Sequence, residues 1–516
     1  MIKISPTKEF SIDEFQSIVI DKEPFELDKD SLELVKESFE FLVDFSKDKV
    51  IYGINTGFGP MAQYVIEDKD QVQLQYNLIR SHAAGVGEKI PDLYVKAIMF
   101  VRMRSIIQGF SGIHPSCVEL LIDMINNDVY PYIPEHGGVG ASGDLVQLSH
   151  LSLIMIGEGL VTYKGKLRPT SEVFNELGLK PIKVVLREGL SLINGTSVMT
   201  GIGMINVIKA KQLLNWAIAA SAMIIEVVES FDDYFSKELN DVKRHHGQSR
   251  IAEELRQILA DSKLINRREN HFYNNFKNNG TKHIVQRKVQ EYYSLRCVPQ
   301  ILGPVFDTIR FAEEVVLNEM NSVSDNPIVD LKTRNVYHGG NFHGDYVSIE
   351  MDKLKLAVTK LSMLSERHLA FLCNSKLNEK LPPFVNLGKL GLNLGMQGVQ
   401  FTATSTVAEN QTLSNSMYVH SIPTNNDNQD IVSMGTNSAM MTKRVIDNAY
   451  QVVAVEMMAL LQAIDYLEYR DNLSSFTKKV YDNLRSLVPK FIEDTPKYEE
   501  LAKLSKYMFE NDIDKK

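Results

Sequence analysis

The loop at residues 137–144 contains residue types whose spacing could perform covalent chemistry. Its sequence is Gly-Gly-Val-Gly-Ala-Ser-Gly-Asp. The amide nitrogen of Gly143 could attack the carbonyl carbon of Ala141, because glycine has no Cβ to obstruct ring closure. Loss of water from the ring and from the Ser142 side chain would leave an exocyclic methylene conjugated to an imidazolone. That product is a strong electrophile, and the flanking glycines permit the strained backbone that cyclisation requires.

Two other interpretations of this loop remain open. The pattern Gly138-x-Gly140-x-x-Gly143 formally matches a dinucleotide-binding fingerprint, which requires a hydrophobic strand directly before it. The preceding segment, residues 129–136, contains two prolines, which interrupt a central strand and disfavour nucleotide binding. The remaining interpretation is an ordinary turn before a helix that begins near Leu145, with Asp144 as its N-cap.

Four further loops are rich in glycine, asparagine and small polar residues. They are residues 52–59, 194–197, 339–344 and 425–430. A turn is the default explanation for any one such loop. Five in a helical chain indicate a site that is assembled from loops on a rigid scaffold.

The scaffold that must position these loops is predicted to be mainly α. Apolar residues recur at helical spacing over residues 354–369 and 445–467. Residues 205–228 are apolar on most sides, as expected for a helix inside a bundle. Segments with strand-like alternation are few, so sheet is expected to be a minor component.

Composition excludes several classes of protein. The chain has 516 residues and a formal charge of −9, which argues against nucleic-acid or anionic-lipid binding. Its three cysteines are too widely spaced for a disulfide framework or a metal knuckle. The longest apolar run, residues 216–225, is too short to span a bilayer, and no signal-peptide pattern is seen. We therefore expect a cytoplasmic protein without nucleic-acid or membrane partners.

The run from Gly137 to His150 resembles the signature of the histidine and aromatic amino acid ammonia-lyases. The resemblance extends over roughly residues 50 to 470, where further segments follow the order known from that family. These segments are residues 52–59, 77–85, 188–196, 293–297, 321–327 and 339–344.

The resemblance implies a prosthetic group and a reaction. In that family the Ala-Ser-Gly triplet, here Ala141-Ser142-Gly143, becomes 4-methylidene-imidazol-5-one (MIO) without a metal or nucleotide cofactor. The enzymes remove ammonia from an L-α-amino acid to give a trans-α,β-unsaturated acid. The methylene derived from Ser142 would capture the substrate amine. Tyr52 matches the family's catalytic tyrosine and would take the β-proton as a phenolate, which requires a lowered pKa and a dry site.

Further residues are assigned to the substrate or to MIO by the same resemblance. Arg296 would pair with the substrate carboxylate, because a guanidinium meets a carboxylate bidentately. Tyr293 matches a catalytic-site residue near MIO. The other side chains expected at MIO or the substrate are Asn194, Gln429, Phe342, Gln290, Leu145 and Glu409. No metal site is implied, and the His245-His246 pair is interpreted as solvated surface.

The motifs point to more than one amino acid as the substrate. The dipeptide Ser81-His82 is the form usual in histidine lyases, and Glu409 resembles the acid that those enzymes direct at the imidazole. Residues 428–435 instead resemble the phenylalanine and tyrosine lyases, and residues 395–398 depart from the histidine pattern. An imidazole at position 82 can also hydrogen-bond a phenol. Taken together, the chain most resembles a branch of bacterial tyrosine ammonia-lyases that carries Ser-His in the ring pocket, so we favour a tyrosine ammonia-lyase that produces trans-4-coumarate. Histidine ammonia-lyase and tyrosine 2,3-aminomutase stay open.

The resemblance also predicts the architecture and the assembly. The fold would be that of the fumarase/aspartase-like superfamily. Residues 1–204 would form an N-terminal region that carries the Tyr52 and MIO loops, and residues 205–516 a long helical bundle with C-terminal helices. A homotetramer is expected, in which each active site draws residues from three subunits. A catalytically inactive helical scaffold is disfavoured because Tyr52, Arg296 and the Ala141–Gly143 triplet occur together.

Overall fold

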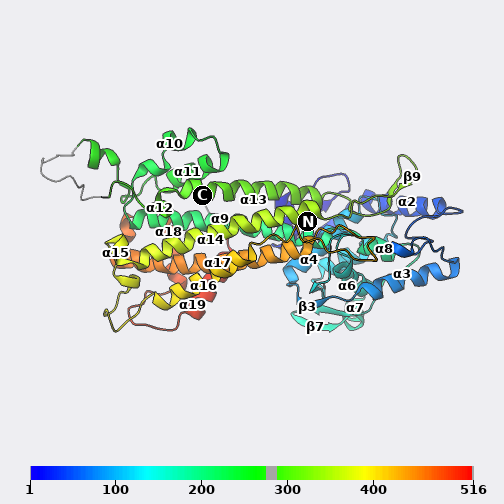
Figure 1. Ribbon diagram of the computed structural model, residues 1–516. Coiled ribbons are helices and arrows are strands. Elements are labelled where there is room, and N and C mark those ends of the chain that lie inside the picture. The colour runs from blue at the N-terminus through cyan, green and yellow to red at the C-terminus, as the bar shows by residue number, and fades with distance from the viewer. Residues whose placement is uncertain (1, 275–287, 514–516) are drawn as a thin grey trace. The chain divides into compact units, whose positions relative to one another are not determined.

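The computed structural model describes residues 2–274 and 288–513, and it is predominantly helical (Figure 1). Long helices dominate the chain: α9 (Ser197–Val227), α13 (Val298–Met320), α14 (Asp345–Cys373) and α17 (Gly435–Leu467). Every strand is only two to four residues long. The prediction of a mainly α fold with little sheet is confirmed.

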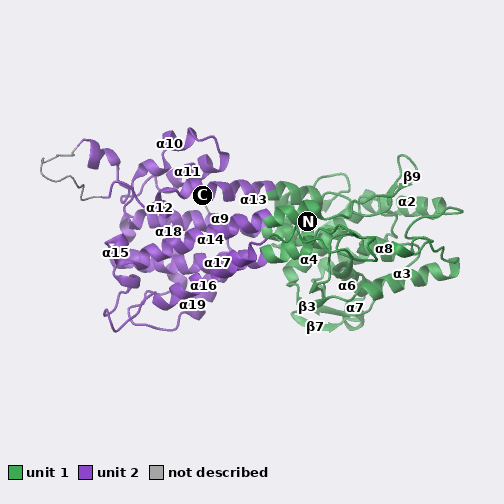
Figure 2. Cartoon of the chain, in the orientation of Figure 1, with its two compact units in different colours: residues 1–206, 312–352, 416–442 green, residues 207–311, 353–415, 443–516 purple. Residues whose placement is uncertain are grey.

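The chain forms two compact units, shown in different colours in Figure 2. Unit 1 comprises residues 1–206, 312–352 and 416–442, and unit 2 comprises residues 207–311, 353–415 and 443–516. The domain boundary predicted after residue 204 lies close to the first boundary between the units, after residue 206. Whether it separates two domains stays a prediction.

Unit 1 combines short helices with four small sheets. The strands pair as β1–β2, β3–β5, β4–β6–β7 and β8–β9. Their bounds are β1 (Ile2–Ile4), β2 (Phe25–Leu27), β3 (Val86–Lys89), β4 (Tyr130–Pro131), β5 (Pro134–His136), β6 (Leu160–Tyr163), β7 (Lys166–Pro169), β8 (Ile328–Asp330) and β9 (Asn335–Tyr337). Because β5 pairs antiparallel with β3 in a two-stranded sheet, the glycine-rich loop that follows β5 lacks the parallel βαβ setting of a dinucleotide site.

The other helices of unit 1 are α1 (Ile12–Val19), α2 (Lys29–Phe45), η1 (Gly59–Met61), α3 (Asp68–His82), α4 (Asp92–Ile106), α5 (Ser116–Asn126), α6 (Leu145–Met155), α7 (Thr170–Leu177) and α8 (Glu188–Ile193). Helices α3 and α8 approach closely, since a Cβ added to Gly189 would lie 2.7 Å from the carbonyl oxygen of Gln75. The buried Gln75 side chain accepts from the amide of Leu190 and donates to the carbonyl of Gly53. It therefore connects α8 to the loop that carries Tyr52.

Unit 2 is a helical bundle. Besides parts of the long helices it contains η2 (Asp232–Phe235), α10 (Lys237–Asp241), α11 (His246–Ile258), η3 (Glu269–Tyr273), α12 (Tyr293–Arg296), α15 (Ser375–Asn378), η4 (Pro383–Val385), α16 (Gln397–Leu413), η5 (Arg470–Asn472), α18 (Ser475–Leu487) and α19 (Tyr498–Glu510). The predicted apolar faces are buried: Leu354 and Val358 of α14 and Val453 and Leu460 of α17 each have 0% exposure. Helical periodicity therefore identified the core of the bundle.

Among the residues that the structure describes, no helix is long and apolar enough to cross a membrane.

Candidate active site

The glycine-rich loop is held against the segment that precedes α9. Gly143 forms an isolated parallel bridge with Gly195, and the amide of Asp144 donates to the carbonyl of Gly195 at 2.8 Å. Gly143 has a φ of +71°, and a Cβ added there would lie 2.0 Å from the Gly195 carbonyl oxygen. Both the backbone conformation and the lack of space therefore require glycine at position 143.

The start of the loop is held by other segments of unit 1. The carbonyl oxygen of Gly140 accepts from the Ser433 hydroxyl at 3.0 Å and from the Gly344 amide at 3.2 Å. Ala141 is 4% exposed and belongs to a buried cluster with Val432 and Met434. The Ala141–Gly143 triplet is thus fixed on both sides in a largely buried setting.

Asp144 does not cap the helix that it precedes, contrary to the prediction. It occupies the N-cap position of α6, but its side chain makes no capping hydrogen bond there. One carboxylate oxygen instead accepts from the amides of Val198 and Met199, each at 2.9 Å, and the other accepts from the Thr436 hydroxyl. Asp144 is therefore an acceptor for the free amides at the start of α9. Complete burial raises its pKa to about 6.

Two predicted partners contact Ser142. The Gln429 side-chain amide donates to the Ser142 hydroxyl at 2.8 Å, and the Asn194 side-chain amide donates to the Ser142 carbonyl oxygen at 3.3 Å. The Oδ1 atom of Asn194 is buried and has no hydrogen-bond partner within the described ranges. The side-chain amides of Asn194 and Gln429 can therefore donate hydrogen bonds to a polar group formed from Ser142. The Oδ1 of Asn194 can accept a hydrogen bond from such a group or from a ligand bound next to it.

A cavity of about 780 Å³ in unit 1 gathers most of the predicted site. It is lined by seven predicted residues: Tyr52, His82, Ser142, Leu145, Asn194, Phe342 and Gln429. Other lining residues were not predicted individually. Phe58, Asn77, Leu190 and Asn326 lie inside the motifs already noted and His338 directly precedes one, whereas Met61, Ala62 and Leu74 lie outside the motifs. The motifs therefore indicated most, but not all, of this wall.

Tyr52 is placed in this cavity with its hydroxyl near the backbone of its own loop. The hydroxyl accepts from the Gly59 amide at 3.3 Å, and the ring packs edge-on against Phe58 with centroids 6.1 Å apart. Burial raises the pKa of Tyr52, although the Gly59 amide and the positive charge of Arg187 act in the opposite direction. This direction is opposite to the lowered pKa that was predicted from the sequence, because desolvation outweighs the two contributions that stabilise the phenolate.

The hydrogen bonds of His82 indicate which ring nitrogen carries the proton. Its Nδ1 lies 3.0 Å from the carbonyl oxygen of Leu78 and 3.0 Å from the Ser81 hydroxyl, which itself donates to that carbonyl. Since a carbonyl only accepts, Nδ1 carries the hydrogen in the neutral ring. Nε2 is then a hydrogen-bond acceptor on a residue that lines the cavity.

Three other predicted residues line a different cavity. Gln290, Tyr293 and Arg296 border a space of about 1280 Å³ in unit 2. The Arg296 guanidinium lies 4.8 Å from the centre of the Tyr293 ring, and its buried Nε has no hydrogen-bond partner in the part of the chain that the structure describes. A buried donor without a partner beside an open cavity is suited to an anionic ligand.

Glu409 lies outside the cavity that contains Ser142. It belongs to α16 in unit 2, where its carboxylate accepts from the side-chain amide of Asn448 at 2.8 Å and pairs with Arg444 at 3.3 Å. Its assignment to the substrate region therefore stays a prediction.

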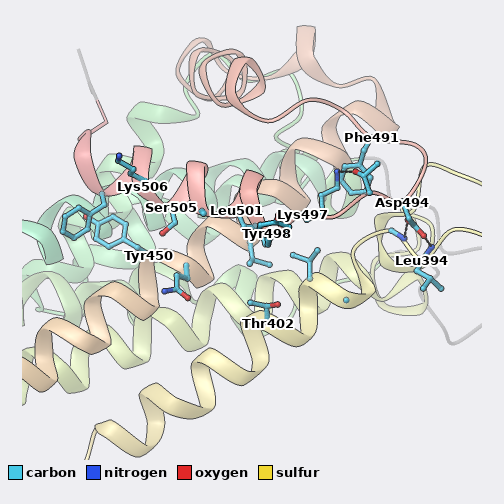
Figure 3. Close-up of a pocket in the computed structure, with 18 of the residues that line it drawn as sticks. Leu394, Thr402, Tyr450, Phe491, Asp494, Lys497, Tyr498, Leu501, Ser505 and Lys506 are labelled. Atoms are coloured by element: carbon cyan, nitrogen blue, oxygen red, sulfur yellow. Dashed lines mark hydrogen bonds between the residues drawn. The ribbon is translucent and has the colours of Figure 1, made fainter. Parts of the chain in front are cut away.

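A third cavity, of about 980 Å³, lies among α16, α17 and α19 and is drawn in Figure 3. Its wall is largely apolar, and several of the labelled polar groups have partners of their own. Lys497 pairs with Glu500 at 3.2 Å, and Asp494 accepts from the amide of Leu394 at 2.7 Å. It contains none of the predicted site residues, so we do not assign the chemistry to it.

Within residues 2–274 and 288–513, no group of three or more His, Cys, Asp or Glu side chains is arranged to hold a metal ion.

Gly143→Ala is expected to lower the free energy of unfolding by about 3 kcal/mol or more, because the added Cβ would combine a strained φ with overlap on the Gly195 carbonyl. Gly165→Ala is the matched control: its φ is +72°, yet nothing lies within 4 Å of an added Cβ. That variant should lose only about 1–2 kcal/mol. Denaturant unfolding of the two proteins checks this, and equal losses would contradict the account of the loop.

Comparison with known proteins adds independent evidence. Residues 10–486 match the family described as aromatic amino acid lyase. The chain is 40% identical over 452 residues to a tyrosine 2,3-aminomutase of Chondromyces crocatus, covering 87% of this chain and 85% of that protein. It is 37% identical over 449 residues to a histidine ammonia-lyase of Geobacillus, with coverage of 87% and 85%.

A solved structure gives the same result for the fold. The crystal structure of the tyrosine aminomutase from Streptomyces globisporus superposes with a TM-score of 0.94 and 33% sequence identity, covering 98% of this chain and 96% of that one. The similarity therefore extends over nearly the whole length of both chains.

Proposed function

The chain belongs to the family of aromatic amino acid lyases, and from that premise we propose that it eliminates ammonia from L-tyrosine to give trans-4-coumarate. One observation carries this proposal. The cavity of unit 1 combines the Ala-Ser-Gly loop with a phenol, an imidazole acceptor and two side-chain amides, supplied by Tyr52, His82, Asn194 and Gln429. These groups meet the needs of an elimination from an amino acid that carries a polar ring.

The electrophile of the proposed reaction is MIO, formed from Ala141, Ser142 and Gly143. The observed surroundings fit this group: Gly143 can only be glycine, Ala141 is buried, and the hydroxyl and carbonyl oxygens of Ser142 each accept a hydrogen bond. When formed, MIO supplies an electrophilic methylene that converts the poorly leaving amino group of the substrate into a better one. Asn194 and Gln429 are then the residues that hold and polarise it.

Tyr52 is the proposed base for the β-proton. Its hydroxyl already receives a hydrogen bond from the Gly59 amide, which favours the phenolate over the phenol. Burial acts against the phenolate, but it also excludes water from the proton transfer. The Tyr52 loop therefore provides a base that becomes more effective as the pH rises.

His82 is the residue proposed to recognise the substrate ring. With the hydrogen on Nδ1, its Nε2 can accept from a phenol hydroxyl or from an imidazole N–H. A phenylalanine ring offers no donor, so it would leave this acceptor unpaired and bind less well. The Nε2 acceptor of His82 therefore favours tyrosine and histidine over phenylalanine as substrates.

The substrate carboxylate is assigned to Arg296, which together with Gln290 and Tyr293 lines the cavity of unit 2. We propose that the active enzyme is a homotetramer in which these three residues are supplied to the Ser142 cavity by another subunit. The exposed Tyr293 ring (71%) and the Arg296 Nε, which has no partner within residues 2–274 and 288–513, support a surface completed by assembly. Fully active monomers would contradict this arrangement.

Two alternatives follow from the relatives. A tyrosine 2,3-aminomutase would perform the same elimination and then return ammonia to the β-carbon, and the 40% identical relative of that name supports it. A histidine ammonia-lyase is supported by Ser81-His82 and by the relatives of that name. We favour the tyrosine lyase because residues 428–435 carry the pattern that resembles tyrosine and phenylalanine enzymes.

The proposal is tested by incubating the purified full-length protein separately with L-tyrosine, L-histidine and L-phenylalanine and recording the ultraviolet band of the conjugated acid. Turnover of tyrosine to 4-coumarate is expected. Urocanate formed from histidine alone would overturn the substrate assignment. Chromatography of the tyrosine reaction distinguishes the aminomutase, because β-tyrosine as the main product would replace 4-coumarate.

His82→Phe is expected to shift the ratio of kcat/KM for tyrosine over phenylalanine by about 10- to 100-fold toward phenylalanine, because it removes the Nε2 acceptor that would pair with the phenol. It also removes the Nδ1 bond to Leu78, which affects both substrates alike. His136→Phe serves as the control, since His136 is an exposed histidine of unit 1 that does not line this cavity. If the ratio of kcat/KM for tyrosine over phenylalanine is unchanged in His82→Phe, His82 does not recognise the substrate ring.

A further inference from the structure

The short helix α12 carries two of the proposed site residues, Tyr293 and Arg296, and it is held from behind by a buried histidine. Nε2 of His368, on α14, lies 2.7 Å from the carbonyl oxygen of Ser294 in the middle of α12. Because a carbonyl can only accept, Nε2 must be the donor. His368 therefore fixes the backbone between the two site residues.

The other ring nitrogen of His368 is held by Glu456 of α17. Nδ1 and the carboxylate Oε1 are 2.7 Å apart, and both side chains are 1% exposed. Glu456 Oε2 is buried and has no partner among the residues described. Each group thus depends on the other, and the histidine–glutamate pair forms a rigid link from α17 through α14 to α12.

A helix as short as α12 cannot hold its own position. It spans four residues, and its last turn ends at Cys297 before α13 begins. Carbonyls at a helix end lack a partner in the following turn, so an external donor is needed to orient them. Arg296 Nε has no partner among the described residues, and its guanidinium lies against the Tyr293 ring of the same helix. The direction of the guanidinium therefore depends on how α12 is held.

We infer that His368, oriented by Glu456, is a positioning residue that holds α12 so that Arg296 meets the carboxylate of the substrate. This inference rests on the proposed function, because it assigns Arg296 to a carboxylate ligand. The pair touches no reacting atom. Its effect is to restrict the guanidinium to one direction before the ligand arrives, which lowers the cost of ordering it on binding.

The test must separate positioning from stability. Removing His368 alone would leave the Glu456 carboxylate buried without a partner, which is strongly destabilising. The double variant H368L/E456M replaces both groups by apolar side chains of similar size, an exchange that is often neutral for stability. It keeps the core filled but removes the donor to Ser294.

Two ligands make the measurement specific for the carboxylate. Calorimetric binding of 4-coumarate and of 4-vinylphenol, which lacks the carboxylate, is compared in wild type and H368L/E456M. We expect 4-coumarate to bind about 10-fold or more weakly in the variant, with 4-vinylphenol unchanged and KM for tyrosine raised more than kcat is lowered. Equal affinities for 4-coumarate in the two proteins would overturn the inference.

If the apolar double variant does not fold, two variants that also carry E456Q, so that no buried charge is left without a partner, support the same decision. H368Q places an amide donor near the position of Nε2, whereas H368N places one near Nδ1. Positioning predicts that H368Q/E456Q retains 4-coumarate binding better than H368N/E456Q, and equal loss in both would overturn it. Failure of the proposed function is seen separately, as a wild type that neither turns over tyrosine nor binds 4-coumarate, and it would also remove the premise of this inference.

Discussion

Replacing Ser142 by alanine is expected to reduce turnover of L-tyrosine by about 10³-fold or more, since the electrophile would be lost altogether. Alanine has no hydroxyl to leave as water, so the exocyclic methylene cannot form. The cavity should otherwise remain, because backbone groups of Gly140 and Asp144 hold the loop that contains Ser142. The Gly140 carbonyl accepts two hydrogen bonds, and the Asp144 amide donates to Gly195. Steady-state formation of 4-coumarate measures the effect.

The matched control for this variant is Ser152→Ala. Ser152 is fully buried on α6, and its hydroxyl bonds only to the Leu148 carbonyl at 2.8 Å among the contacts described. It should retain turnover within a few-fold of wild type. Comparable turnover by the Ser142→Ala and Ser152→Ala proteins would refute a catalytic role for Ser142.

Replacing Tyr52 by phenylalanine is expected to lower kcat by about 10²- to 10⁴-fold, the range typical for loss of a general base. The phenyl ring can keep its edge-on packing against Phe58, so the change is confined to the hydroxyl and its bond to Gly59. Binding of 4-coumarate should change little. Tyr64→Phe, at an exposed tyrosine that follows η1, is the control and should leave kcat unchanged. An unaltered kcat in Tyr52→Phe would assign the proton transfer to another group.

The pH dependence of kcat should follow the same residue. Burial raises the pKa of Tyr52 above its ordinary value of 10.0, and the base is active only when deprotonated. At saturating L-tyrosine, kcat should therefore rise with pH between about pH 7 and 9.5, without a plateau in that range. The residual rate of Tyr52→Phe should lack this rise. A wild-type plateau near neutral pH would mean that the assembled enzyme lowers the pKa of Tyr52.

The long helices could be predicted from sequence because their apolar residues recur with one period over many turns. That signal located the buried faces of α14 and α17. The composition of the two units could not be predicted, because residues 312–352 and 416–442 join unit 1 from far along the chain. Periodicity describes one face of one helix and carries no information about which distant segment covers it.

The candidate site was predictable to the extent that its residues lie in motifs. Seven predicted residues line one cavity, although they come from segments up to several hundred positions apart. The partners of Asp144 were not predictable, because Val198, Met199 and Thr436 are distant in sequence and contribute only two backbone amides and one hydroxyl. The direction of the Tyr52 pKa was missed for a related reason, since burial depends on the whole fold.

The placement of Arg296 and Tyr293 could not be inferred from their motif either. A motif assigns a role to a residue, but it does not state which cavity of the chain the residue lines. These two side chains lie in unit 2 with Gln290, whereas Ser142 lies in unit 1. In the tetramer proposed above, different subunits supply the two groups of side chains, and sedimentation of the active protein would test this.

The most direct test of the central claim is the mass of the proteolytic peptide that contains Ala141, Ser142 and Gly143. If the chain makes its own electrophile, the wild-type peptide should be lighter than its sequence mass by the water lost in ring closure and the water lost from Ser142. The Ser142→Ala peptide cannot lose the second water. A wild-type peptide at its full sequence mass, from protein that turns over L-tyrosine, would contradict the account.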